Sequence, residues 1–157
     1  MPWHPPRKHP RLDPDLYAEE GRICFITTNT KERQNVFANA ELANVAIETI
    51  ITHSQKSEVP VYAYCVMQDH LHLLISASSR CDIITFVGQV KNLITRASWQ
   101  HGVEGSFWQK SFWDHFLREE ESVEQVAEYI LDNPVRKGMV KSWREYPYSG
   151  SLVLEME

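Results

Sequence analysis

The chain has 157 residues and a mass of 18.3 kDa, the size of one domain that can bury a sizeable core without disulfide or metal support. Apolar residues make up 43% and charged residues 24% of it, a composition typical of globular proteins and not of disordered or membrane-spanning ones. With 16 Lys and Arg against 21 Asp and Glu, the net charge is −5, and that balance alone argues against strong binding to nucleic-acid phosphates.

The N-terminal stretch is dominated by proline, because five of the eight prolines lie in the first fourteen residues. We therefore expect residues 1–20 to form an extended, basic, Pro-rich arm with little packed structure, and residues 21–157 to form a single domain. The arm lacks the apolar run of a signal peptide. Three cysteines without a C-x-x-C pair favour a reducing cytoplasm over a secreted disulfide framework.

Hydrophobic periodicity predicts the remaining elements in chain order. They are a strand over 22–30, a helix over 41–56, strands over 61–67 and 70–77 joined by a tight turn, a helix over 82–100, an aromatic strand or irregular segment over 107–118, and a helix that begins at Ser122 and ends at Pro134. This order predicts an α+β fold with a ferredoxin-like antiparallel sheet and two helices on one face. The additional C-terminal helix carries Tyr129 and is expected to cover or border the other face.

Two histidines share one face of the strand over 70–77. Side chains alternate along a strand, so Leu71 and Leu73 should face the helices while His70 and His72 face outward on the opposite side. Residues two apart on a strand lie roughly 6 to 7 Å apart, a spacing that lets two imidazoles hold one divalent metal. An H-x-H pair also occurs as an ordinary structural or solvent-exposed pair.

The last predicted helix places Tyr129 and Asn133 one turn apart at the edge of its apolar stripe. Taken alone, the tyrosine fits an amphipathic packing residue with its hydroxyl at the rim. Asn133, before Pro134, equally fits a residue at a helix end.

Taken together, three blocks carry a resemblance to a known family: MQDHLHLLI (67–75), FWQKSFWDHFLR (107–118) and YILDNPVRKGMV (129–140). The chain resembles the HUH-type single-tyrosine transposases of insertion sequences, and most closely the REP-associated tyrosine transposases. The resemblance covers nearly the whole folded region, from ITTNTKERQNVF to REYPYSG. One departure is Gln68, where family members often carry proline.

The resemblance implies a metal-dependent single-stranded DNA endonuclease and strand transferase that acts on hairpin-forming, REP-like repeats. It implies that His70, His72 and Asn133 hold a metal ion and that Tyr129 attacks the DNA phosphate to form a covalent phosphotyrosine. Imidazole ligands by themselves favour zinc, copper, nickel or iron, whereas the family implies Mg or Mn. The oligomeric state is left as monomer or homodimer.

Cations that could contact DNA occur in the arm, in the helix over 82–100 and after Asn133. They are Arg7, Lys8, Arg11, Lys91, Arg96, Arg136 and Lys137. The acidic excess is local, since residues 119–132 carry a net charge of −6 and residues 133–145 carry +3. DNA binding should therefore depend on hairpin shape and a few local cations.

Two other functions remain open at this point. One is a zinc hydrolase in which Tyr129 is structural. The other is a non-catalytic nucleic-acid-binding domain of ferredoxin-like fold derived from a transposase.

Overall fold

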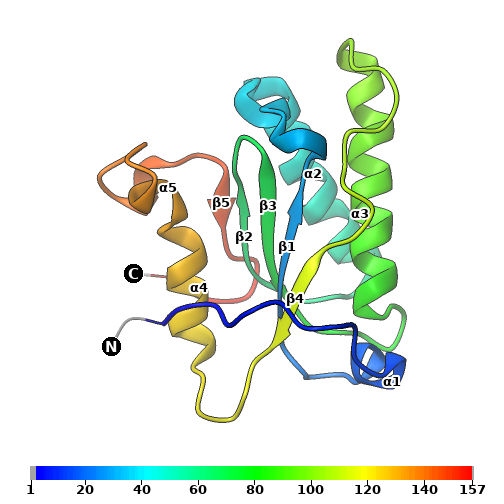
Figure 1. Cartoon of the computed structure of the whole chain (residues 1–157), viewed down its shortest axis with the longest axis vertical. Coiled ribbons are helices and arrows are strands. Elements are labelled where there is room, and N and C mark those ends of the chain that lie inside the picture. Colours follow the sequence, from blue (N-terminus) through cyan, green and yellow to red (C-terminus); the bar gives the residue numbers. More distant parts are fainter. Residues whose placement is uncertain (1–2, 157) are drawn as a thin grey trace.

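A five-stranded sheet forms the centre of the molecule (Figure 1). The computed structural model describes residues 3–156. All strand pairs are antiparallel, in the order β4-β1-β3-β2-β5. The strands are β1 (Cys24–Asn29), β2 (Val61–Val66), β3 (His70–Ile75), β4 (Trp113–Phe116) and β5 (Ser149–Gly150). The first four have the ferredoxin-like order, which confirms the predicted fold class, and β5 extends the sheet beyond β2.

Two long helices, α2 (Ala40–Ser57) and α3 (Ile83–Ser98), cover one face of the sheet (Figure 1). Side chains of Asn39 and Asp82 accept hydrogen bonds from backbone amides of the first turns, which stabilises both helix starts. Leu71 and Leu73 point into this layer and belong to its buried core, as their alternation with the histidines predicts. Both helices and the strands β1, β2 and β3 lie within one or two residues of their predicted bounds.

A second core lies on the other sheet face, beneath α4 (Val123–Leu131) and α5 (Asn133–Arg136). Ser122 accepts the amide hydrogen bond of Gln125 at 3.3 Å, so the predicted N-cap forms. Pro134 does not end the helical region as expected. It lies in the first turn of α5, where a proline has no amide hydrogen bond to lose.

The N-terminal segment differs most from expectation. Residues Pro14–Ala18 form the short helix α1, begun by the Asp13 side chain, and Tyr17 is fully buried. Its hydroxyl donates to Asp114 Oδ2 at 2.6 Å, and Arg11 Nη1 donates to Asp114 Oδ1 at 2.9 Å. The expectation of an unpacked arm is wrong for this stretch, because the buried carboxylate on β4 binds two of its side chains. The single domain over 21–157 stays a prediction.

Short elements complete the chain. Short 3-10 helices occupy Lys31–Arg33, Val36–Ala38, Trp99–His101 and Trp143–Glu145. Only Trp113–Phe116 of the aromatic segment is a strand, while Phe107 and Trp108 are buried in the core beside α3. Among the described residues, no helix has both the length and the apolar character needed to cross a bilayer.

Candidate active site

His70 and His72 lie on β3, in the middle of the sheet between β1 and β2. Their side chains point away from α2 and α3, as predicted, but they do not face solvent. Their residues are only 5% and 8% exposed, because α4 and α5 lie over that face. The histidines therefore lie on the predicted face of the sheet but are not exposed to solvent, because helices distant in sequence complete the layer above them.

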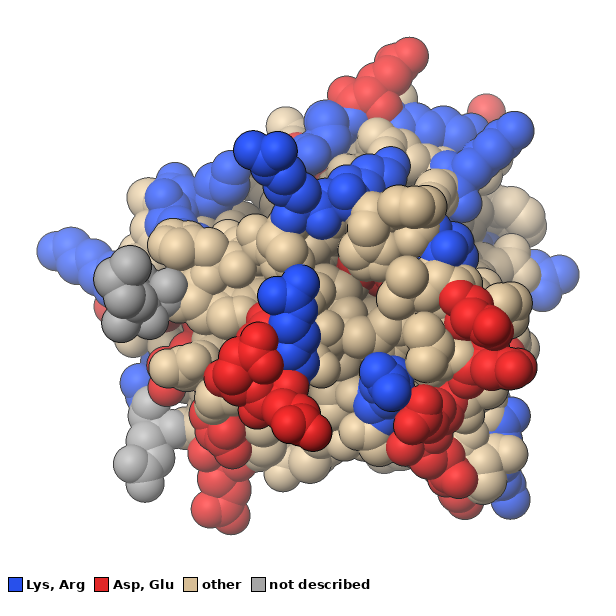
Figure 2. Space-filling view, turned by 60° about the horizontal axis from the view of Figure 1, so that its bottom comes forward, with Lys and Arg blue, Asp and Glu red and all other residues tan. Residues whose placement is uncertain are grey.

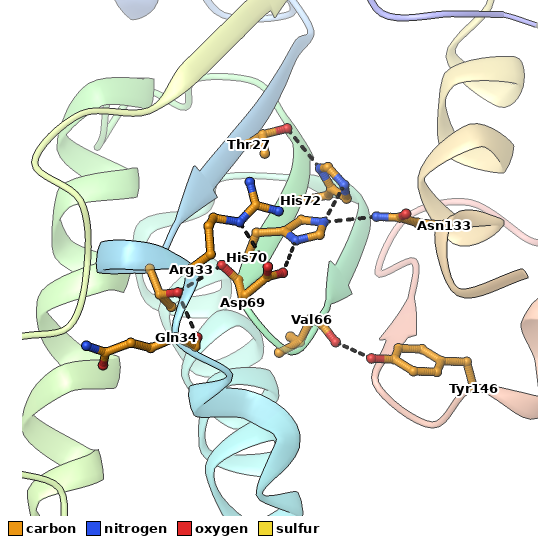
Figure 3. Close-up of polar contacts among 10 residues, drawn as sticks. Thr27, Arg33, Gln34, Val66, Asp69, His70, His72, Asn133 and Tyr146 are labelled. Atoms are coloured by element: carbon orange, nitrogen blue, oxygen red, sulfur yellow. Dashed lines mark hydrogen bonds and ion pairs between the residues drawn. The ribbon is translucent and has the colours of Figure 1, made fainter. Parts of the chain in front are cut away.

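The two imidazoles converge with the Asn133 amide (Figure 3). His70 Nε2 lies 3.2 Å from His72 Nε2 and 3.1 Å from Asn133 Nδ2. The histidines come from β3 and the asparagine from α5, so three polar groups from two elements meet at one point.

The outer nitrogen of each ring is held by a neighbour. His70 Nδ1 lies 2.7 Å from Asp69 Oδ1, and His72 Nδ1 lies 2.9 Å from Thr27 Oγ1. Asp69 is bound in turn by Arg33 Nε at 2.9 Å. These contacts orient both rings and favour a proton on each Nδ1, which leaves the Nε2 lone pairs directed into the shared space.

Burial also determines the charge of these groups. Burial lowers the pKa of His70, although the neighbouring Asp69 carboxylate acts in the opposite direction. Burial lowers the pKa of His72 further, and the positive charges of His70 and Arg136 add to this effect. Although burial raises the pKa of Asp69, the hydrogen bonds from Arg33 and His70 outweigh it and lower the net value. At neutral pH the site therefore holds two neutral imidazoles beside a carboxylate.

The arrangement fits a divalent ion. Two nitrogens about 2.1 Å from one ion, at an angle of about 90 to 109°, lie roughly 3.0 to 3.4 Å apart, which includes the observed 3.2 Å between the Nε2 atoms. Turning over the Asn133 amide would present its oxygen in place of Nδ2. Within residues 3–156, no three His, Cys, Asp or Glu side chains gather as a metal site, so any third protein ligand would come from another residue type, and the Asn133 amide lies 3.1 Å from His70 Nε2.

Tyr129, on α4, lines the same hollow, which we call the histidine cavity. The cavity measures about 410 Å³, and its wall includes Thr27, His70, His72, Asn133 and the cations Arg33, Arg136 and Lys137. The guanidinium carbon of Arg136 lies 3.7 Å from the centroid of the tyrosine ring. Trp3 of the arm packs edge-on against the same ring, with centroids 5.1 Å apart. The predicted tyrosine, histidines and asparagine are thus brought together.

The predicted DNA-contacting cations lie in different parts of the molecule. Arg136 and Lys137 line the histidine cavity, whereas Lys91 and Arg96 lie on α3, across the sheet from it. Lys91 Nζ donates to the carbonyl oxygen of Gln109 at 2.7 Å, and its burial lowers its pKa. Arg7 and Lys8 are exposed on the arm, where no contact with the cavity occurs among the described residues.

Other polar residues take positions that the sequence left undecided. Arg11 forms an ion pair with the buried Asp114, and His115 lies 2.8 Å from Glu121, so both Asp114 and His115 belong to pairs at the edge of the core. Sequence reasoning missed Thr27 and Arg33. Asp69 had one available signal, since it precedes His70 directly in the tight turn.

The domain combines an antiparallel ferredoxin-like sheet, an H-x-H pair on a central strand, and a tyrosine-bearing helix above that pair. Comparison with known proteins identifies the family to which such a domain belongs. The family model described as Transposase IS200 like matches residues 23–133. The chain belongs to this family.

Within the family, the matching relatives are REP-associated tyrosine transposases. One from Haemophilus influenzae is 30% identical over 98 residues, which is 55% of this chain and 56% of the relative. The chain thus matches little more than half of that relative's length. One from Escherichia coli is 25% identical over 134 residues, 85% of this chain and 78% of the relative.

Solved structures share the fold. A REP-associated tyrosine transposase bound to a REP hairpin superposes with a TM-score of 0.72 at 24% identity, over 91% of this chain and 81% of that chain. A transposase from Deinococcus radiodurans superposes with a TM-score of 0.52 at 23% identity, over 69% and 87% of the two chains.

Proposed function

We propose that the protein is a metal-dependent single-stranded DNA endonuclease and strand transferase, which acts on hairpin-forming, REP-like DNA through a covalent phosphotyrosine. The observation that carries this proposal is the histidine cavity, in which Tyr129 shares one wall with His70, His72 and Asn133. Membership of the IS200-like transposase family supports it, as do relatives named for REP elements.

The proposed reaction is an exchange of phosphodiester bonds. Tyr129 Oη attacks the phosphorus, a bond between them forms, and the bond to the leaving sugar oxygen breaks. The phenol loses its proton and the leaving oxygen gains one, so a DNA end with a free hydroxyl departs. The energy of the broken ester is retained in the phosphotyrosine, which suits rejoining to another strand better than hydrolysis.

Cations around the tyrosine would bind the phosphate during this exchange. Arg136 stacks on the Tyr129 ring and Lys137 lines the same cavity. Both side chains can therefore contact the phosphate before and after its transfer to the tyrosine. Arg33 is tied to Asp69 and contributes mainly by fixing the carboxylate that orients His70.

We propose His70, His72 and Asn133 as the residues that hold Mg²⁺ or Mn²⁺. When bound, such an ion neutralises charge that develops on the phosphate and favours ionisation of a nearby hydroxyl. Neutral imidazoles fixed by Asp69 and Thr27 suit this role, because a ligand must offer a free lone pair.

The proposed DNA partner is a hairpin with adjoining single strand. Charges are unevenly distributed: on the face shown in Figure 2, basic side chains gather toward the upper edge and acidic ones toward the lower. A hollow lined by Glu19, Glu20, Glu119 and Glu121, against Arg22 and Arg118, has an acidic excess that disfavours phosphates. DNA is therefore expected to bind on the side of Arg136 and Lys137.

A purely nucleic-acid-binding domain is less well supported. Ferredoxin-like sheets that bind RNA use an open sheet face and its aromatic residues, whereas α4 and the arm cover that face here (Figure 1). The buried convergence of His70 and His72 would have no purpose in such a domain.

Cleavage of a labelled REP-like hairpin oligonucleotide, followed on a denaturing gel, tests the proposal. With Mn²⁺ we expect a shortened labelled strand, and with EDTA no product. A bound but intact oligonucleotide under every metal condition would favour the non-catalytic alternative. Cleavage that requires zinc and survives Tyr129→Phe would favour the zinc hydrolase.

A further inference from the structure

A second hollow adjoins the histidine cavity on the other side of Tyr129. This arm pocket measures about 390 Å³ and lies between the N-terminal arm and the outer side of α4. It shares Tyr129 and Arg136 with the histidine cavity. A nucleotide next to a phosphate at Tyr129 would therefore have the arm pocket directly beside it.

Aromatic rings form the arm side of this pocket. Trp3 and His4 line it, and both pack edge-on against the Tyr129 ring, with centroids 5.1 and 6.4 Å away. The Trp3 indole is fixed, because its Nε1 donates to Glu121 Oε2 at 2.6 Å and its ring packs on Phe25. Aromatic rings held in this way are the usual surfaces on which unpaired bases stack.

Acidic and amide groups form the opposite side. Gln125 and Glu128 line the pocket from α4, and Asp132 lines it from the position just after the helix. They belong to the stretch 119–132, whose net charge is −6. Binding of DNA phosphates gives no reason for negative charge at this place. Carboxylates repel phosphates, but they accept hydrogen bonds from amino groups on base edges.

We propose that the arm pocket binds an unpaired nucleobase with an exocyclic amino group, as on cytosine, adenine or guanine, from a nucleotide that flanks the phosphate attacked by Tyr129. This inference deepens the proposed function and rests on it. Trp3 and His4 stack on the base, while Glu128 and Asp132 accept from its amino group. The pocket thereby selects the sequence at the cleavage point and disfavours thymine, which has no such amino group.

Equilibrium binding tests the pocket without chemistry. The Tyr129→Phe variant, which keeps the ring, is titrated in Mn²⁺ with fluorescent hairpin oligonucleotides that differ only in one flanking base: an amino-bearing base, thymine or an abasic site. We expect the amino-bearing base to bind roughly tenfold tighter than thymine at one flanking position, about what one good contact to a base edge supplies. The abasic oligonucleotide should bind weakest, because stacking is lost.

Added variants assign the effect to the pocket. Combining Glu128→Gln with Asp132→Asn should remove the preference over thymine, and Trp3→Ala should remove the difference between thymine and the abasic site, while Trp3→Phe largely keeps it. Glu124→Gln is the matched control, because Glu124 lies on the same helix but outside the pocket. It should leave both ratios unchanged.

Equal affinity for base and abasic site at both flanking positions would overturn the inference, as would a thymine discrimination that persists in the Glu128→Gln, Asp132→Asn variant. Cleavage by the wild-type chain is measured in parallel. Cleavage without any base preference overturns the pocket and leaves the transferase standing. A base preference without cleavage overturns the transferase and leaves the pocket standing. Failure to bind DNA overturns both the pocket and the transferase.

Discussion

The guanidinium of Arg136 lies on the face of the Tyr129 ring, 3.7 Å from its centroid, although the two residues belong to different helices. The short helix α5 begins at Asn133 and carries the cation back over the last turns of α4. The ring is thus held between this cation and Trp3 of the arm. One side chain can therefore both position the proposed nucleophile and bind the phosphate that it attacks.

Replacing Arg136 tests this double role. Arg136→Ala should lower the cleavage rate roughly tenfold or more, since the substitution removes a cation–π contact and a charge-assisted phosphate contact. Arg136→Lys should recover part of the rate. The matched control is Arg144→Ala, because Arg144 also stacks on an aromatic ring, that of Trp143 at 4.7 Å, outside the histidine cavity. Equal losses for both variants would contradict a local role.

The paired histidines should act as one unit. His70→Ala and His72→Ala should each reduce Mn²⁺-dependent cleavage at least a hundredfold, and the double variant should be no worse than either single one. Both variants should fold with only a modest loss of stability, about 1 to 3 kcal/mol, from the unpaired groups left behind. Cleavage gels and thermal unfolding measure the two effects. A single variant that cleaves at the wild-type rate would exclude the metal assignment.

Thr27 and Thr28 offer a matched pair on β1. Thr27 Oγ1 holds His72 Nδ1 at 2.9 Å, whereas Thr28 Oγ1 is buried and has no hydrogen-bond partner among residues 3–156. Thr27→Val should raise the Mn²⁺ concentration needed for half-maximal cleavage about 10- to 100-fold, as expected when the group orienting a ligand is lost. Thr28→Val should leave it unchanged. A metal titration of both variants decides, and identical curves would show that Thr27 does not orient His72.

The contact that attaches the N-terminal segment to β4 should contribute to the free energy of unfolding, which can be measured. Tyr17→Phe removes the hydroxyl that donates to the buried Asp114 at 2.6 Å, so it should lower the free energy of unfolding by about 2 kcal/mol. Tyr62→Phe, which removes a longer contact of 3.3 Å to a neutral hydroxyl, should cost about 1 kcal/mol or less. Urea unfolding compares the two. Equal costs would mean that Asp114 does not anchor this segment.

Local patterns were sufficient for most of the framework. Alternation along β3 separates Leu71 and Leu73 from His70 and His72, because side chains on a strand change face at every residue. It could not reveal the burial of the histidines, which depends on α4 and α5 some sixty residues later in the chain. Composition was misleading at the N-terminus, where Asp13 followed by Pro14 was an available signal for a helix start.

Contacts between distant segments account for the rest of the site. Arg33 has a left-handed backbone with φ of 53° and binds Asp69, and nothing in the adjacent sequence marks it for that role. Likewise, Trp3 reaches Tyr129 only because the arm crosses the sheet face beside α4 (Figure 1). The roles of such residues depend on tertiary contacts, so local sequence patterns do not predict them.

The central claim is that Tyr129 becomes covalently joined to DNA, and the mass of the protein after reaction with a REP-like hairpin oligonucleotide and Mn²⁺ tests it most directly. We expect the wild-type chain to gain the mass of one cleaved fragment, with digestion locating the added nucleotide on the peptide that contains Tyr129. The Tyr129→Phe variant should gain none. Cleavage without an adduct, or an adduct on any other residue, would contradict the account.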